Sequence, residues 1–280
     1  MRARALILCL AVATGPAFPW GLAAHRVITE SAAQRVSGPA ADFFRRAGRR
    51  LSDASVEPDT ILRGHDRSGE EPRSHFINLD AYEPFPFAGI PRQIEDAEAR
   101  YGRDAVARNG TLPWRIAGVL KDLAGAMRRG DGARIVTNAG YLSHYVGDAY
   151  QPLHLTVHHD GEGACGEGIH RAFEAVMIER SLPRYRDAVL RGRAAVEAID
   201  HPVAFLLDRM RESYPLAERI LEADRDATRG MRKDGRDYWE ELDRRAGPIA
   251  ERQMTSAAAT IAALWYAAWI DAGRPDLPGR

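Results

Sequence analysis

The sequence predicts an all-α protein, a single domain built as a bundle of many helices. Apolar residues recur three and four positions apart along most of the chain, which is the spacing of one buried helix face. No stretch shows the sustained apolar–polar alternation of a half-buried strand. The 280 residues can bury one large core, and 45% hydrophobic with 28% charged residues is ordinary for a soluble globular protein.

The helical spacing appears in a series of segments separated by turn-forming residues. In chain order these segments are 24–36, 93–101, 113–129, 133–149, 169–180, 202–223 and 248–272. Prolines and glycine between 84 and 91, the Gly130-Asp131-Gly132 turn and the glycine-rich stretch 161–168 lie between them. The last segment carries an apolar stripe that includes Met254, Trp265 and Trp269, which we expect in the core.

The first 19 residues have the organisation of a secretory signal peptide. Arg2 and Arg4 form a short basic region, residues 5–13 are apolar, and residues 14–19 are a mainly small-residue region with two prolines. The apolar run is too short to span a membrane, and no later stretch approaches roughly 20 apolar residues. We therefore expect a signal peptide at 1–19, a secreted or periplasmic protein, and one domain at 20–280.

Charge and cysteine content narrow the function classes. The formal net charge is zero, so the chain lacks the basic surface of tight, salt-sensitive nucleic-acid binding. Cys9 lies in the expected signal peptide, which leaves Cys165 alone and excludes an internal disulfide in the mature chain. Bound metal is another source of stability for an exported protein. Nothing in the sequence indicates a transmembrane segment or an obligate protein partner.

Two histidine–carboxylate pairs at helical spacing indicate a metal site. His144 and Asp148 lie four residues apart in segment 133–149, and His170 and Glu174 repeat the spacing. Residues four apart share a helix face, so each pair can bind one cation. A single pair is more often a surface contact. Two pairs with His154 between them favour zinc, because imidazole and carboxylate are standard zinc ligands.

A larger set of residues occurs in the order known from one superfamily. The set is Trp20-Gly-Leu-Ala-Ala-His25, Pro58-Asp59, His75-Phe76, His144-x3-Asp148, Gln151-Pro-Leu-His154 and His170-x3-Glu174. Together they resemble the superfamily that contains S1/P1-type nucleases and zinc-dependent bacterial phospholipases C. The resemblance extends from Trp20 to about Arg180, and the closing helix with Trp265 resembles the phospholipase branch. It implies a multi-helix bundle of the phospholipase C/P1 nuclease type.

The resemblance implies three zinc ions and assigns their ligands. The first ion would be held by four side chains, Asp59, His75, His144 and Asp148. The second would be held by three, His154, His170 and Glu174. The third would be held by the main-chain amine and carbonyl of Trp20, by His25 and by Asp148 as a bridge. A free amine on Trp20 requires a mature chain that begins there.

The implied chemistry is hydrolysis of phosphodiester bonds. Neighbouring zinc ions about 3.5–4 Å apart lower the pKa of a bound water, so that hydroxide can attack phosphorus near neutral pH. Asp148 as the bridge and Asp59, which could orient or deprotonate that water, are the expected catalytic residues. Nitrogen ligands must be neutral, so we expect activity to fall in acid.

Features of both branches occur in the sequence, so the resemblance leaves the class of substrate open. Glu174 as the last ligand and the short 154–170 interval resemble the phospholipase branch, and a phospholipase C-like substrate is slightly favoured. The short interval from Trp20 to His25 and the His75-Phe76 pair resemble the nuclease branch. Thr60 after Asp59 and Ala23 do not supply the choline-binding residues of the phospholipase pattern.

Three residues are candidates for substrate binding. Two alternatives to a phospholipase C-like hydrolase also stay open. The candidates are Phe76, Asn78 and Arg63, of which Phe76 could stack on a base or lie in the core. One alternative is a single-strand-preferring nuclease that releases 5′-phosphates. The other is a zinc-stabilised secreted binding protein without turnover.

Further acidic residues and histidines have no assigned position in the superfamily pattern. Asp53 and Asp80 are alternatives to Asp59, but only Asp59 follows the matching proline. Surface or structural roles are expected for the remaining histidines, His65, His158, His159 and His201.

Overall fold

The computed structural model describes residues 20–161, 168–194, 199–229, 233 and 235–278. The described residues form helices, turns and loops and include no strand, which confirms the all-α prediction. The expected signal peptide at 1–19 and Cys165 lie outside the described residues. In the described part of the chain, no helix is both long and apolar enough to cross a membrane.

The first half of the described chain contains helices α1 to α9. They are α1 (Leu22–Arg35), α2 (Ala41–Ala54), α3 (Arg63–His65), α4 (Glu70–Arg73), α5 (Leu79–Tyr82), α6 (Ile94–Tyr101), α7 (Arg103–Asn109), α8 (Leu112–Arg128) and α9 (Gly132–Ala149). The second half contains α10 (Ile169–Arg171), α11 (Met177–Arg180), α12 (Leu182–Arg191), α13 (Pro202–Ser213), α14 (Pro215–Thr228) and α15 (Arg236–Asp271). Two π-helical turns, η1 (Pro58–Leu62) and η3 (Ala172–Val176), and one 3₁₀ turn, η2 (Pro152–Leu155), complete the set.

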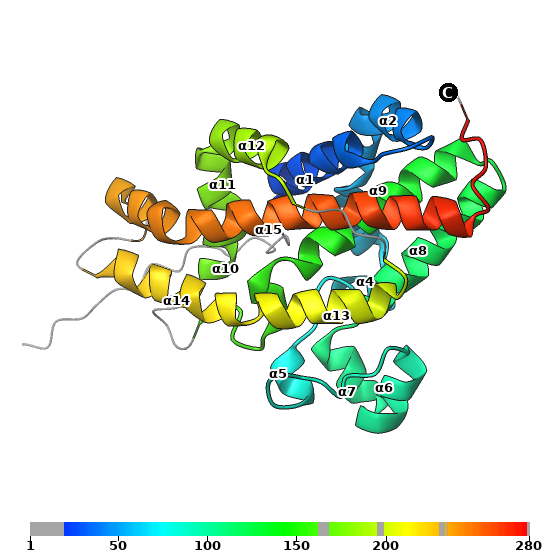
Figure 1. Cartoon of the computed structure of the whole chain (residues 1–280). Coiled ribbons are helices and arrows are strands. Elements are labelled where there is room, and N and C mark those ends of the chain that lie inside the picture. The colour runs from blue at the N-terminus through cyan, green and yellow to red at the C-terminus, as the bar shows by residue number, and fades with distance from the viewer. Residues whose placement is uncertain (1–19, 162–167, 195–198, 230–232, 234, 279–280) are drawn as a thin grey trace, which may run out of the picture.

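The long helix α15 runs through the middle of the bundle, with α1 and α12 along one side and α14 along another (Figure 1). Its predicted apolar stripe is buried, as expected. Trp265 stacks on Phe44 of α2 with ring centroids 4.6 Å apart, and its indole donates to the carbonyl of Ala139 in α9 at 3.1 Å. One side chain of α15 therefore joins α2 and α9, the neighbours of the site.

Helix α9 is enclosed by other helices. It contacts α1, α2, α8 and α15, and every residue from 142 to 150 is buried. Asp131 caps its start by accepting from the backbone amide of Arg134 at 3.0 Å. Because neighbours cover it on several sides, its polar residues His144 and Asp148 lie in the interior of the bundle.

Several helix boundaries differ from the sequence prediction. The segment predicted at 202–223 is two helices, because Pro215 has no amide hydrogen and its ring restricts Tyr214. The last helix begins at Arg236 and continues through Pro248, where the sequence indicated a start. Helices α2 and α12 were not predicted, although Phe43, Phe44, Ala47 and Leu51 of α2 have helical spacing and are buried.

Candidate metal centre

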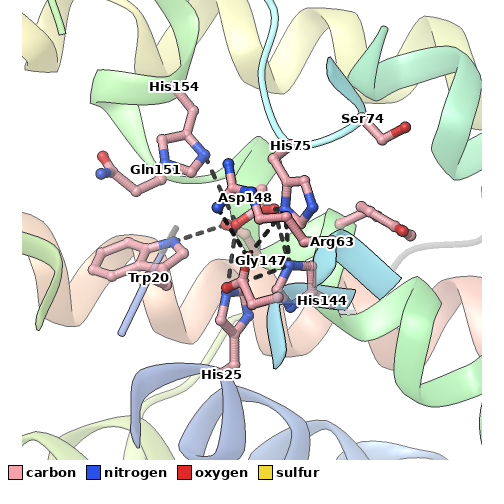
Figure 2. A network of polar contacts seen from close by, with 12 residues as sticks. Trp20, His25, Arg63, Ser74, His75, His144, Gly147, Asp148, Gln151 and His154 are labelled. Atoms are coloured by element: carbon pink, nitrogen blue, oxygen red, sulfur yellow. Dashed lines mark hydrogen bonds and ion pairs between the residues drawn. The ribbon is translucent and has the colours of Figure 1, made fainter. Parts of the chain in front are cut away.

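Eight predicted ligand side chains from separate elements converge on the interior of the bundle. Figure 2 shows His25, His75, His144, Asp148 and His154 pointing toward one another. His25 comes from α1, Asp59 from η1, and His75 from the loop after α4. The rest come from α9, η2, α10 and η3, where they are His144, Asp148, His154, His170 and Glu174. Each of these side chains except the half-buried His170 is fully or almost fully buried. They form three groups in which the ligand atoms lie within 4.8 Å of one another: His25–His144–Asp148, Asp59–His75–His144 and His154–His170–Glu174.

The cluster Asp59–His75–His144 joins residues that are far apart in the chain. Nε2 of His144 lies 3.0 Å from Nδ1 of His75 and 3.9 Å from Oδ2 of Asp59. Nδ1 of His75 lies 3.8 Å from Oδ1 of Asp59. These three ligand atoms lie within 4.8 Å of one another, which is close enough for them to bind one cation together.

The protonation of His144 is set by a backbone group. Its Nδ1 lies 2.8 Å from the carbonyl oxygen of Ser55, so that nitrogen carries the proton and donates it. Burial, with the charge of His25, holds the pKa of His144 well below its usual value, so the ring is neutral. The lone pair on Nε2 therefore faces His75 and the carboxylates, which is the form that binds a metal.

Asp148 lies between two of the clusters and presents one oxygen to each side. Its Oδ1 lies 3.4 Å from Nε2 of His25 and 3.7 Å from Nδ1 of His154. Its Oδ2 lies 3.1 Å from Nδ1 of His75 and 3.4 Å from Nε2 of His144. Although burial opposes ionisation, the charges and hydrogen bonds of these imidazoles hold the pKa of Asp148 well below its usual value.

The cluster His154–His170–Glu174 is equally compact. Nε2 of His170 lies 3.0 Å from Nε2 of His154 and 2.8 Å from Oε2 of Glu174. Gln151 donates its amide to Oε2 of Glu174 at 3.0 Å and caps the backbone amide of Leu153 with its carbonyl oxygen. Gln151 therefore fixes both the Glu174 carboxylate and the turn that carries His154.

Both acidic ligands outside α9 lie in π-helical turns. In η1, which contains Asp59, the amide of Arg63 donates to the carbonyl of Pro58 five residues earlier. In η3, which contains Glu174, the amide of Met177 donates to the carbonyl of Ala172. Such wide turns are rare and recur at functional sites, because they shift a side chain away from its regular helical direction.

Trp20 and His25 pack closely against α9 at Gly147, next to Asp148. The Trp20 side chain is fully buried against Phe173, and its indole donates to the carbonyl of Gly147 at 2.8 Å. A Cβ atom on Gly147 would lie 3.1 Å from Nδ1 of His25, so only glycine lets this ring approach α9 without displacement. The Gly21 amide donates to the carbonyl of Glu174 at 3.0 Å, which places this end of α1 beside η3.

The donor set fits a metal better than it fits a closed hydrogen-bond network. Several buried atoms of the ligand side chains have no hydrogen-bond partner among the described residues, among them Asp59 Oδ2, His75 Nε2, Asp148 Oδ1, His154 Nδ1 and Glu174 Oε1. Such atoms are costly unless they are paired or coordinate an ion. Their oxygen and nitrogen chemistry and tight grouping match zinc.

Burial and neighbouring charges shift the pKa values of three other ligand residues, Asp59, His75 and His170. Burial is the main cause that raises the pKa of Asp59 to about 7, although His75 opposes it. Burial lowers the pKa of His75, but the neighbouring carboxylates of Asp148, Glu71 and Asp59 outweigh it and raise the value to about 9. Burial also disfavours the His170 cation, yet Glu174 raises the pKa of His170. The carboxylates and imidazoles of the centre thus shift one another's pKa values.

The predicted substrate-binding residues are less closely connected to the centre. Arg63 donates to Oδ1 of Asp59 at 3.4 Å. Phe76 follows His75 and is half-buried, with its carbonyl accepting from the amide of Leu112. Asn78 is half-buried, and its amide donates to the carbonyl of Asn109. Of the three, Arg63 is the one for which the described part of the chain shows a side-chain hydrogen bond to a ligand residue.

The alternatives to Asp59 have other partners. Asp53 forms an ion pair with Arg26 at the surface. Asp80 accepts from Thr156 at 2.5 Å and from the amide of Val157 at 3.1 Å, so it secures the loop after η2. The histidines without an assigned role, His65, His158, His159 and His201, have exposed side chains.

Three residues of the centre received no role from the sequence. They are Gly147, Gln151 and Glu71, of which Glu71 lies four residues before His75 and 3.3 Å from its Nε2. The four-residue spacing between Glu71 and the proposed ligand His75 could have indicated from the sequence that their side chains meet. Gly147 and Gln151 lie inside matched motifs, but only the packing shows what they contact.

The comparisons place this site in a known fold. No family model matches the chain. The alpha-toxin of Clostridium absonum superposes with a TM-score of 0.51 at 15% identity, covering 89% of this chain and 63% of that one. The alpha-toxin of an avian strain of Clostridium perfringens gives a TM-score of 0.54 at 14% identity, with coverages of 94% and 66%. The chain therefore shares the fold of clostridial alpha-toxins, as the sequence resemblance predicted, and spans just under two thirds of their length.

One curated relative carries a different description. A probable serine protease of Bradyrhizobium tropiciagri is 28% identical over 210 residues. The match covers 62% of this chain and 25% of that protein, so the chain spans about a quarter of its curated relative.

Proposed function

We propose that this protein is a secreted, zinc-dependent hydrolase of phosphodiester bonds that acts on phospholipid-type substrates. The observation that carries the proposal is the buried Asp148 carboxylate, which has imidazoles on both oxygens and joins adjacent ligand clusters. Alpha-toxin is a phospholipase C, and its fold extends over about nine tenths of this chain. A buried multi-metal donor set in that fold supports phosphodiester hydrolysis over other reactions.

The ligand residues and Arg63 would have separate roles in the reaction. Zinc bound by the three clusters would polarise the phosphoryl oxygens and acidify a water. Asp148 would hold the ligand clusters at a constant separation, and the Ser55 carbonyl keeps the His144 lone pair directed inward. Asp59 would orient the attacking water, and Arg63, which contacts the Asp59 carboxylate, could also meet a phosphate oxygen.

The proposed third site depends on processing. The main-chain nitrogen of Trp20 is a metal ligand only as a free amine, which requires cleavage after Pro19. The buried indole and its hydrogen bond to Gly147 support a fixed position for Trp20 beside Asp148. Three zinc ions and a mature chain at 20–280 are therefore part of the proposal.

The test uses the exported protein loaded with zinc. We expect hydrolysis of bis(p-nitrophenyl) phosphate, release of phosphocholine from phosphatidylcholine vesicles, and no activity after chelation. The matched variants are Asp59→Asn at the site and Asp53→Asn at the surface, and only the first should abolish turnover. Cleavage of single-stranded DNA with intact vesicles would replace the phospholipid substrate by the nuclease alternative.

Two further outcomes would reject the proposal. Full zinc occupancy without hydrolysis of any of these phosphodiesters would indicate the non-catalytic binding protein. Cleavage of casein that is blocked by a serine-directed inhibitor would favour the activity named for the Bradyrhizobium relative.

A further inference from the structure

Glu71 is a buried carboxylate next to the proposed centre that is not one of its ligands. It lies in α4, is 7% exposed, and its Oε1 lies 3.3 Å from Nε2 of His75. Nε2 forms no hydrogen bond among the described residues, so this contact is an ion-pair contact between the ring and the carboxylate. The opposite nitrogen of the same ring, Nδ1, faces His144 and Asp148 inside the centre.

The Glu71 carboxylate is itself fixed by two donors. Tyr145 in α9 donates its hydroxyl to Oε1 at 2.5 Å, and Arg115 in α8 donates to Oε2 at 3.3 Å. Arg115 also donates to the Tyr145 hydroxyl at 3.1 Å, and its guanidinium carbon lies 5.0 Å from the centre of that ring. Three elements are thus joined around one carboxylate, and its orientation toward His75 is set.

The two ends of the His75 ring have complementary surroundings. A neutral imidazole carries one proton, so a ring that binds metal through Nδ1 must carry it on Nε2. Glu71 lies at Nε2 and can accept that proton in a hydrogen bond. A carboxylate in this position orients the ring, fixes its tautomer and makes the ligand nitrogen more basic.

Resting on the proposed zinc site, we propose that Glu71, held by Tyr145 and Arg115, is a positioning residue that keeps His75 in its metal-binding tautomer. Glu71 acts on the metal through His75 and does not itself touch substrate. A purely structural role can be tested separately, because the chain contains a second buried carboxylate with similar partners and no ligand histidine. That carboxylate is Asp224, 3% exposed, which accepts from Tyr238 at 2.7 Å and from Lys233 at 2.9 Å.

The experiment compares Glu71→Gln, Glu71→Ala and the matched control Asp224→Asn in the full exported chain. Zinc affinity is measured by competition with a chromophoric chelator, and the Co²⁺-loaded protein gives a visible spectrum that reports the ligand geometry. We expect Glu71→Ala to weaken zinc binding by about 10–100-fold and Glu71→Gln, which keeps an acceptor oxygen, by less. Both should alter the cobalt spectrum. Asp224→Asn should change the melting temperature but neither metal readout.

The outcomes separate this inference from the proposed function. If wild-type protein binds zinc and both Glu71 variants match it in affinity and cobalt spectrum, the positioning role is wrong and the proposed function stands. Equal losses in Asp224→Asn would also overturn it, since they would indicate a general effect of a buried carboxylate. If wild-type protein binds no zinc, the proposed function and the inference fail together. Should Glu71→Ala not fold, the isosteric Glu71→Gln decides.

Discussion

Nε2 of His144 and Nδ1 of His75 lie 3.0 Å apart in the interior of the bundle. His144 has already committed its ring proton to the Ser55 carbonyl, so its Nε2 offers a lone pair. Two lone pairs repel at this distance unless a proton or a cation lies between them. In the metal-free protein a proton on His75 fills this role, and zinc would take its place.

Zinc affinity should therefore depend on pH. The raised pKa of His75, about 9, means that its ring is protonated at neutral pH in the metal-free protein. Zinc must displace this proton, so affinity should rise as pH increases towards 9 and fall in acid. Chelator competition across this range tests the direction, and calorimetry in two buffers of different ionisation enthalpy counts the protons released. An affinity independent of pH would contradict this assignment of His75.

Asp148→Asn should remove more metal than any other single carboxylate change. The substitution keeps the side-chain shape but removes a charge that faces imidazoles on both oxygens. Glu174→Gln is the matched comparison, because Glu174 is equally buried but contacts the imidazoles of its own cluster only, His154 and His170. Metal-to-protein ratios by mass spectrometry should rank wild type first, Glu174→Gln second and Asp148→Asn last. Equal ratios for the two variants would rule out a bridging Asp148.

Gly147→Ala should separate helix stability from site integrity. A Cβ atom here would lie 3.1 Å and 3.2 Å from two atoms of the His25 ring, which must then move. Alanine favours a helix over glycine by about 1 kcal/mol, so the melting temperature of the metal-free protein should not fall sharply. Metal content and phosphodiesterase activity should fall.

The control for this change is Gly118→Ala in α8, where a Cβ atom meets nothing within 4 Å. This variant should keep its metal and its activity. If Gly147→Ala also keeps both, close approach of His25 to α9 is not required.

The amino terminus gives an independent test of the third site. Intact mass of the exported protein should correspond to a chain that starts at Trp20 and carries close to three zinc ions, as the superfamily resemblance implies. A variant processed with two extra residues before Trp20 should lose one metal, because its Trp20 nitrogen is an amide. The other two clusters should stay loaded. Retention of all metal by the extended chain would exclude an amine ligand.

Local patterns predicted most of the helices and the pairs within them. His144 with Asp148 and His170 with Glu174 follow from the four-residue helical repeat. The division at Pro215 and the passage of α15 through Pro248 did not follow, because proline is compatible with both a helix start and a kinked interior. The π-helical turns under Asp59 and Glu174 have no sequence signature comparable to a cap or a glycine.

The sequence by itself determined an all-helical chain, the identity of the candidate ligands and the resemblance that connects them. Each of these depends on residue type and on spacing within one helix, which are local properties. Only the tertiary structure decided that Asp148 faces imidazoles on both oxygens, that the Ser55 carbonyl sets the His144 proton, and that Glu71 lies at the outer nitrogen of His75. These contacts join residues from different helices, and their distances depend on how buried faces pack.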